Sequence, residues 1–161
     1  MSKIAIFPGS FDPFTIGHES IVRRALPLFD KVIIAIGQNI NKDGFFPLDK
    51  RIEWIRDIFE KESKIEVQSF KGLTISFCKQ VDAKYIIRGI RTSADFEYER
   101  AVGQVNKALD QNVESIYLLT SPQYSFINST IVRDIIRNGG DAEIFLPHSN
   151  KMREYLKTLK F

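Results

Sequence analysis

Five short runs of apolar, β-branched residues alternate along this chain with segments whose apolar residues recur at helical spacing. Continuous apolar runs are typical of strands buried on both faces of a parallel sheet. The order strand, helix, strand predicts parallel pairing through right-handed crossovers. The sequence therefore predicts an α/β fold, a doubly wound five-stranded parallel sheet with helices on both faces. The predicted strands are Lys3–Phe7, Lys31–Ile36, Lys64–Phe70, Tyr85–Ile90 and Ser115–Thr120.

The segments between these strands are predicted to be helices. The clearest one places Leu48, Ile52, Ile55 and Phe59 on a single face. Pro27 is expected to end or kink the first helix, because proline has no backbone N–H to donate. In such sheets ligands bind beyond the carboxyl ends of the strands, next to helix N-termini. The other predicted helices span about Gly17–Phe29, Leu73–Val81, Phe96–Leu109, Thr130–Arg137 and Lys151–Leu159.

Length and composition indicate a globular chain. Its 161 residues, of which 43% are hydrophobic and 27% charged, predict one domain over residues 1–161. The single cysteine, Cys78, excludes an internal disulfide and is expected to be a small buried hydrophobe. The sequence shows neither a secretory signal nor the roughly 20 consecutive apolar residues that span a bilayer. We therefore expect a cytoplasmic protein that does not bind a membrane.

The net charge suits anionic partners. The formal net charge is +3, from 23 basic and 20 acidic residues. These charges are interspersed and form no basic stripe, so the pattern does not predict nucleic-acid binding. Phosphorylated small molecules suit such a surface.

The segment after the first predicted strand, Pro8–His18, has the layout of a phosphate site. Gly9 and Gly17 would let the backbone approach a bulky anion, and free amides at the start of a helix would donate to it. His18 would add a side-chain donor at the same place. The segment has neither the GxxxxGK(S/T) pattern nor GxGxxG, which argues against a Walker P-loop and a dinucleotide oxidoreductase.

Two short motifs carry a resemblance to known enzymes. Thr15-Ile16-Gly17-His18 resembles the (H/T)xGH signature of the nucleotidyltransferase superfamily, which class I aminoacyl-tRNA synthetases share. Near the other end, Ile127–Arg133 resembles the ISSTxxR signature, and its Ser129 and Thr130 are expected to cap a helix and donate to a phosphate. Asn128 departs from the serine that is usual there. Each motif alone is also compatible with an ordinary helix start.

A longer segment narrows the resemblance to one family. Residues 87–99 resemble the RGLRxxxDFEYE segment of the phosphopantetheine adenylyltransferases. Arg88 and Arg91, three residues apart around a strand end, form a fork suited to phosphates. The alternative is that they form surface salt bridges with Asp95, Glu97 and Glu99.

The resemblance extends from Lys3 to about Pro147 and implies a Rossmann-like nucleotidyltransferase. Its implied reaction is adenylyl transfer from ATP to 4′-phosphopantetheine, with Mg²⁺ as cofactor and a homohexamer as the assembly. It implies a catalytic role for His18. It implies substrate binding by Ser10, Lys42, Thr74 and Arg88. The implied ATP-binding residues are Ser10, Phe11, His18, Gly89, Ile90, Arg91, Glu99, Tyr124, Ser125, Phe126, Ile127, Asn128, Ser129 and Thr130.

Three alternatives to this interpretation remain. A related adenylyl- or cytidylyltransferase would share both short motifs, and the Arg88–Glu99 segment argues against it. An aminoacyl-tRNA synthetase is excluded by the length and by the absence of a KMSKS stretch. A non-catalytic nucleotide-binding module would have no need of His18.

The apolar Phe70 and Leu73 are expected to wall a pantetheine pocket, and His148 is expected at the surface. No protein metal ligands are predicted.

Overall fold

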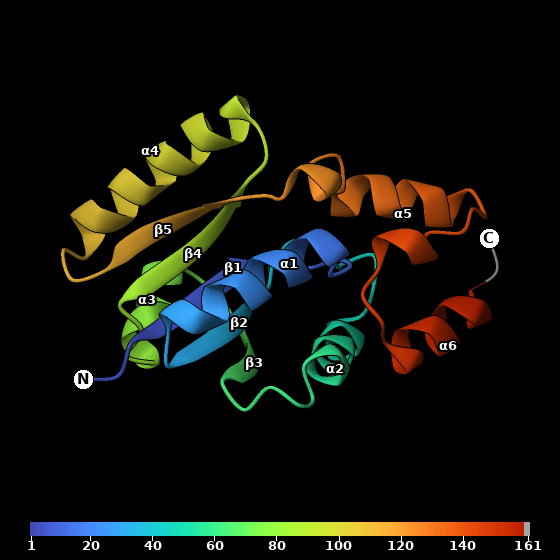
Figure 1. Cartoon of the computed structure of the whole chain (residues 1–161), viewed down its shortest axis with the longest axis horizontal. Helices are drawn as coiled ribbons and strands as arrows, with labels where there is room; N and C mark the ends of the chain where they lie inside the picture. Colours follow the sequence, from blue (N-terminus) through green and yellow to red (C-terminus); the bar gives the residue numbers. More distant parts are fainter. Residues whose placement is uncertain (160–161) are drawn as a thin grey trace.

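The computed structural model describes residues 1–159, and its five strands form one parallel sheet (Figure 1). The strand order is β3-β2-β1-β4-β5, so the chain leaves β1 in one direction and later returns to its other side. This confirms the doubly wound α/β sheet, and each strand lies within two residues of its predicted bounds. The strands are β1 (Ile4–Gly9), β2 (Lys31–Gly37), β3 (Ile65–Phe70), β4 (Tyr85–Ile90) and β5 (Glu114–Leu119).

The helices lie where the apolar spacing predicted them. Helix α1 ends at Ala25, and Leu26–Leu28 forms a short 3₁₀ turn that contains Pro27, as expected. The largest difference at the start of a helix is at α4, which begins at Ser93, because the Thr92 hydroxyl caps it by accepting from the Asp95 amide. The helices are α1 (Ile16–Ala25), α2 (Leu48–Ile58), α3 (Thr74–Gln80), α4 (Ser93–Leu109), α5 (Ser129–Arg137) and α6 (Asn150–Thr158).

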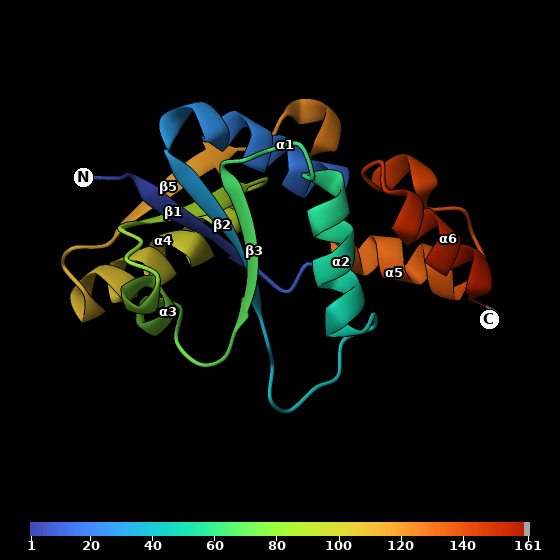
Figure 2. The same cartoon turned by 90° about the horizontal axis from the view of Figure 1, so that it is seen from below.

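Alternate residues of the central strand pack on opposite faces of the sheet. Ala5 and Phe7 of β1 belong to the apolar cluster that α1 and α2 cover, whereas Ile6 belongs to the cluster under α3. Figure 2 shows α1 on one side of the sheet and α3 and α4 on the other. Cys78 of α3 is fully buried in the second cluster, as predicted.

A third apolar cluster joins α2, α5 and α6 at one end of the sheet, and its central side chains include Trp54, Val132 and Met152. This packing brings the start of α5 toward the carboxyl end of β1. His148, between α5 and α6, is exposed, as predicted. Within residues 1–159, no helix has the length and apolar character needed to cross a bilayer.

Candidate active site

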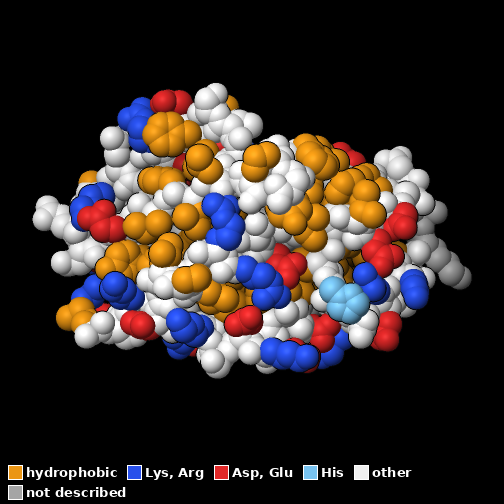
Figure 3. Space-filling model, in the orientation of Figure 1, with side chains coloured by type: hydrophobic (Ala, Val, Ile, Leu, Met, Phe, Trp, Pro, Cys, Tyr) orange, Lys and Arg blue, Asp and Glu red, His pale blue; other side chains and the backbone are white. Residues whose placement is uncertain are grey.

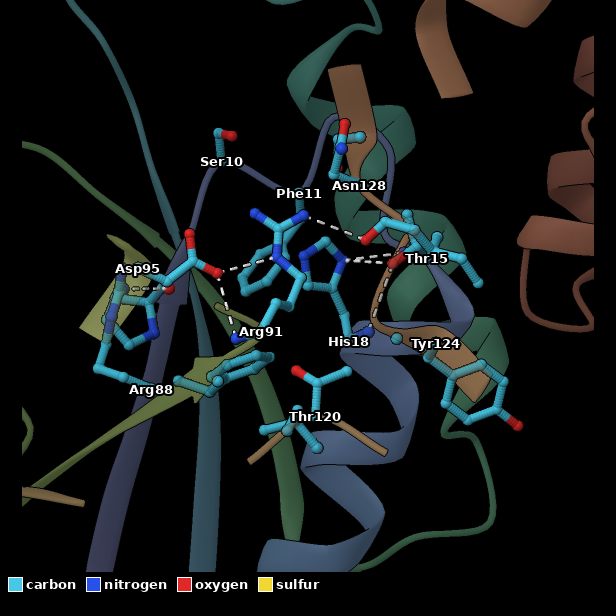
Figure 4. Close-up of a pocket in the computed structure, with 18 of the residues that line it drawn as sticks. Ser10, Phe11, Thr15, His18, Arg88, Arg91, Asp95, Thr120, Tyr124 and Asn128 are labelled. Atoms are coloured by element: carbon cyan, nitrogen blue, oxygen red, sulfur yellow. Dashed lines mark hydrogen bonds and ion pairs between the residues drawn. The ribbon is translucent and has the colours of Figure 1, made fainter. Parts of the chain in front are cut away.

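A cleft of about 400 Å³ opens at the carboxyl ends of β1 and β4, where the order of the strands reverses. In doubly wound sheets this is the position at which ligands bind. Residues from β1, α1, β4, α4 and the segment before α5 line it, and we call it the central cleft (Figure 4). Its lining residues are Phe7, Pro8, Gly9, Ser10, Phe11, Thr15, Gly17, His18, Ile21, Arg88, Gly89, Arg91, Asp95, Glu99, Thr120, Tyr124, Ile127, Asn128, Ser129 and Thr130.

His18 is fixed by the cap of its own helix. Thr15 is the N-cap of α1, and its backbone N–H donates to His18 Nδ1 at 2.9 Å. The Thr15 hydroxyl in turn accepts from the His18 amide at 3.4 Å, which completes a capping box with histidine in the place usually taken by Glu or Gln. Because Nδ1 accepts a hydrogen bond, the neutral ring carries its proton on Nε2. This nitrogen lies on the side of the ring away from Thr15 (Figure 4).

The surroundings keep the His18 ring neutral. Burial, followed by the positive charges of Arg91 and Arg88, lowers its pKa from 6.5 to about 4. Phe11 and Phe14 contribute to this burial, with ring centroids 5.1 and 5.3 Å from that of the imidazole. At neutral pH His18 is therefore an oriented, uncharged hydrogen-bond donor.

This lowered pKa predicts a pH dependence of stability. The unfolded chain takes up a proton on His18 near pH 6.5, whereas the folded chain does so only near pH 4. Stability should therefore fall as the pH drops from about 6.5 to 4, by at most about 3 kcal/mol, and His18 should contribute no slope above that range. Denaturant unfolding at a series of pH values measures the effect. His18→Gln should lose this part of the slope, and an unchanged slope would contradict the lowered pKa.

The two arginines of the cleft are paired with carboxylates of α4. Arg88 donates from Nε to Glu99 Oε2 at 2.7 Å and from Nη2 to Glu99 Oε1 at 2.5 Å, and its Nη1 donates to Pro8 O at 3.0 Å. Arg91 pairs with Asp95 at 3.2 Å. The predicted salt bridges thus form in part, but they line the cleft instead of an outer surface. Glu97 pairs with Arg100 instead.

The start of α5 faces the cleft, and its cap corrects one expectation. Asn128 is the N-cap, with Oδ1 accepting from the Ile131 amide at 2.9 Å, whereas Ser129 and Thr130 had been expected to cap. Ser129 Oγ instead donates to Pro13 O at 2.8 Å and so ties α5 to the β1–α1 loop. Asparagine is an equally good N-cap residue, so the departure from serine leaves the helix start intact.

A smaller cavity of about 180 Å³ adjoins the central cleft, and the two share Pro8, Arg88 and Glu99. Thr74, at the start of α3, lines this side cavity. The apolar residues that wall this side cavity are not Phe70 and Leu73, which were expected to wall a pantetheine pocket. Leu73 is 63% exposed and Phe70 stacks on Phe77, while the side cavity is walled by other residues. Those walls include Ile86, Tyr98 and Val102.

Most of the predicted site residues converge on the central cleft, but some do not. Lys42 lies in the exposed loop between β2 and α2, outside the lining, and Ile90 is buried in the core. Ser125 and Phe126 also fall outside the lining. The sequence does carry a signal for Thr15, because Thr-x-x-His has the spacing of a capping box. No sequence signal singled out Thr120.

Gly9 lines the central cleft, and its missing side chain also has a packing role. A Cβ at Gly9 would lie 2.8 Å from the ring of Phe11, so the missing side chain makes room for that ring beneath the loop. Phe11 itself has φ of 47°, in the left-handed region that few non-glycine residues adopt. The loop that carries the phosphate-site motif is therefore held in a strained shape by packing.

Comparison with known proteins agrees with the fold. A family model described as cytidylyltransferase-like matches residues 6–135. A solved bifunctional NMN adenylyltransferase/ADP ribose pyrophosphatase from Francisella tularensis, in complex with AMP and a manganese ion, shares the fold. It has a TM-score of 0.71 and 18% identity, over 98% of this chain and 48% of that one. The family model, together with the fold, therefore defines a nucleotidyltransferase.

Curated relatives identify the family. The phosphopantetheine adenylyltransferase of Cytophaga hutchinsonii is 54% identical over 148 residues, which make up 92% of this chain and 99% of that protein. The enzyme of the same name from Flavobacterium psychrophilum is 48% identical over 149 residues, 92% of this chain and 98% of that protein. The chain belongs to the phosphopantetheine adenylyltransferase family, and it transfers an adenylyl group from ATP to 4′-phosphopantetheine in coenzyme A biosynthesis.

Proposed function

We propose that this transfer takes place in the central cleft, with His18 as the catalytic residue. The observation that carries the proposal is the orientation of the His18 ring. Because His18 Nδ1 accepts from the Thr15 amide, the N–H of the neutral ring is on Nε2, where it is available to a ligand in the cleft. Two arginines and the start of α1 lie around the same space, which suits an anion.

The reaction needs positioning more than it needs a protein nucleophile. A phosphate oxygen of 4′-phosphopantetheine attacks the α-phosphorus of ATP, the bond to the bridging oxygen breaks, and pyrophosphate leaves. Both reactants are anionic, so the protein must bring like charges together and stabilise the charge that builds in the transition state. A fixed, neutral Nε2–H donor would stabilise that charge. The positive charges of Arg88 and Arg91 would reduce the repulsion between the two anionic reactants.

We assign the acceptor to the Arg88 side of the cleft and ATP to the α5 side. Arg88 and Glu99 line both the central cleft and the side cavity. An acceptor whose phosphate lies near Arg88 would therefore extend its pantetheine arm past Thr74. Ser10 lies at the central cleft, between the two substrates in this assignment. The proposed ATP-binding residues are Phe11, Gly89, Ile90, Arg91, Glu99 and Tyr124–Thr130.

Lys42 and Arg88 are proposed to hold the acceptor phosphate. Lys42→Ala and Arg88→Ala should each raise KM for 4′-phosphopantetheine on the order of ten- to a hundredfold, because each removes a charged donor. KM for ATP should change much less. Steady-state kinetics with each substrate varied in turn separates the two effects.

A matched control for Lys42 is Lys61→Ala, since Lys61 is an exposed lysine in the turn before β3, at the other end of the sheet. This variant should behave like the wild type. Loss of ATP binding with unchanged acceptor affinity would reverse the assignment. Arg88→Ala also leaves Glu99 without its ion pair, so its melting temperature must be measured alongside.

We also propose that Mg²⁺ takes part as a cofactor that arrives with ATP. Among residues 1–159, no three His, Cys, Asp or Glu side chains are grouped as metal ligands. Asp95 and Glu99 at the cleft are engaged by arginines. Phosphate oxygens and water would then be the principal ligands, which agrees with the preference of Mg²⁺ for keeping several waters. Bound there, the ion would neutralise phosphate charge.

A homo-oligomer is proposed from the outer surface of α4, and the family resemblance implies six copies. Only Glu99 is buried among the 17 residues of this helix. Tyr98, Val105 and Leu109 are 69%, 58% and 53% exposed, and their spacing of seven and four residues places them on one stripe. Hydrophobic side chains reach the surface over α4 and the neighbouring strands (Figure 3). Such a stripe is typical of a protein interface.

A charge on this stripe should weaken the assembly. Val105→Glu would place a carboxylate in the apolar contact, where the cost of desolvation opposes association. Light scattering coupled to size exclusion should give a smaller mass for Val105→Glu than for the wild type. Ile144→Glu, at an exposed apolar position beyond α5, is the matched control and should keep the wild-type mass. A monomeric wild type, or a variant with unchanged mass, would contradict the proposal.

The cytoplasm is the proposed place of action. The only cysteine of the chain is a buried free thiol, and burial raises its pKa to about 11. A protein without disulfides is typical of a reducing compartment, which also supplies ATP.

A further inference from the structure

The loop that joins β1 to α1 is held by side chains from two other helices. Arg51 of α2 donates from Nη1 to Ser10 O at 2.7 Å. Arg133 of α5 donates from Nη1 to Asp12 O at 2.8 Å, and Ser129 Oγ donates to Pro13 O. Three carbonyls within four residues are thus satisfied by distant side chains. The loop therefore cannot shift without breaking several hydrogen bonds at once.

The side chain of Asp12 connects this loop to the loop that follows β2. Its side chain is buried, and its two oxygens accept from consecutive backbone amides, Phe45 N at 2.7 Å and Phe46 N at 2.8 Å. Short hydrogen bonds to an ionised acceptor are among the stronger ones in proteins. The loop over residues 38–47, which carries Lys42, is therefore anchored at its far end to the residue next to Phe11.

The same loop also positions the catalytic ring. Phe11 lies directly before Asp12, and its ring packs edge-on against His18 with centroids 5.1 Å apart. The left-handed backbone of Phe11 costs free energy that the surrounding contacts must supply. Asp12 therefore connects two elements. Its neighbour Phe11 packs against the ring of His18, and its own side chain binds the loop that carries Lys42.

We propose that Asp12 is a positioning residue that sets the Lys42 loop relative to His18, so that the acceptor phosphate is held at the right place for attack. This inference rests on the proposed role of Lys42 in acceptor binding. Asp12 itself contacts no substrate in this account. Its carboxylate acts through the two amides it binds, and its effect should appear chiefly in the kinetics of the acceptor.

The central variant is Asp12→Asn, which keeps the shape of the side chain but replaces one acceptor oxygen with an NH₂ group that cannot accept from an amide. Hydrogen exchange in the peptide covering residues 38–47 should become faster on the order of tenfold at positions 45 and 46. KM for 4′-phosphopantetheine should rise by a similar factor, while KM for ATP changes little. A general loss of stability would not raise KM for one substrate and leave KM for the other unchanged.

A second variant perturbs the same junction from the other loop. A Cβ at Gly44 would lie 2.9 Å from Phe46 O and 3.1 Å from Asp12 Oδ2, so Gly44→Ala should displace the loop without removing the carboxylate. It should reproduce the rise in acceptor KM, and it decides the matter if Asp12→Asn does not fold. The matched control is Asp30→Asn. Asp30 also accepts from a backbone amide, Lys3 N at 2.7 Å, but at the exposed opposite end of β1.

The outcomes separate this inference from the role of Lys42. Faster exchange at positions 45 and 46 together with a raised acceptor KM, both absent in Asp30→Asn, supports the inference. If Lys42→Ala leaves the acceptor KM unchanged while Asp12→Asn raises it, the assignment of Lys42 fails, and Asp12 then positions the loop over residues 38–47 without acting through Lys42. Folded Asp12→Asn and Gly44→Ala proteins with wild-type exchange or wild-type acceptor KM would overturn the inference.

Discussion

Replacing His18 with alanine is expected to lower kcat by on the order of 10²–10³, the usual cost of losing one donor that stabilises charge in a transition state. KM for ATP should change much less, because the developing charge exists only in the transition state. Steady-state kinetics with saturating substrates, together with direct titration of ATP binding, measures both quantities. Turnover close to that of the wild type in a folded His18→Ala protein would rule out the catalytic role.

The structure shows why alanine alone is an incomplete test. His18 Nδ1 accepts from Thr15 N, so His18→Ala also removes half of the capping box of α1, which costs about 1 kcal/mol of stability. Glutamine at this position can restore the cap. His18→Gln should therefore keep the wild-type melting temperature but still lose most of its turnover, because the amide cannot place a donor where Nε2 lies. His148→Ala, at an exposed position, serves as the control for mutating a histidine.

The second large effect concerns the acceptor. The protein should release pyrophosphate from ATP with 4′-phosphopantetheine and fail with nicotinate mononucleotide or glycerol 3-phosphate. The two short motifs place helix starts at the central cleft, which would suit any phosphate, whereas Arg88 and Glu99 line both the central cleft and the side cavity. An elongated acceptor with a phosphate at one end suits two connected cavities with Arg88 between them.

One assay series tests this selectivity. Purified protein is incubated with ATP, Mg²⁺ and each acceptor in turn, and pyrophosphate release is followed. Pantetheine without its phosphate should not react, because it lacks both the nucleophile and the partner of Arg88. Release of pyrophosphate with nicotinate mononucleotide or glycerol 3-phosphate, but not with 4′-phosphopantetheine, would contradict the expected selectivity.

The order of strands and helices could be predicted from the sequence because it depends on local periodicity. Apolar runs predicted the five strands to within two residues, and the spacing of apolar residues from Leu48 to Phe59 predicted α2. Both helix starts at the cleft were also encoded locally. A capping residue lies within three positions of the amide it binds, so Thr15 and Asn128 act through short-range geometry.

The partners of the charged side chains were decided only by the tertiary structure. Arg88 takes Glu99, eleven residues away and across the turn into α4, in preference to other nearby carboxylates. Asp12 binds amides more than thirty residues away. Such pairings depend on the sheet order and on how each loop closes, and neither leaves a periodic signal in the sequence. The sequence alone thus determined the layered fold and the residue types at its carboxyl edge. The three-dimensional packing decided which of those residues share the central cleft, that Lys42 lies outside its lining, and that Asp12 ties the two loops together.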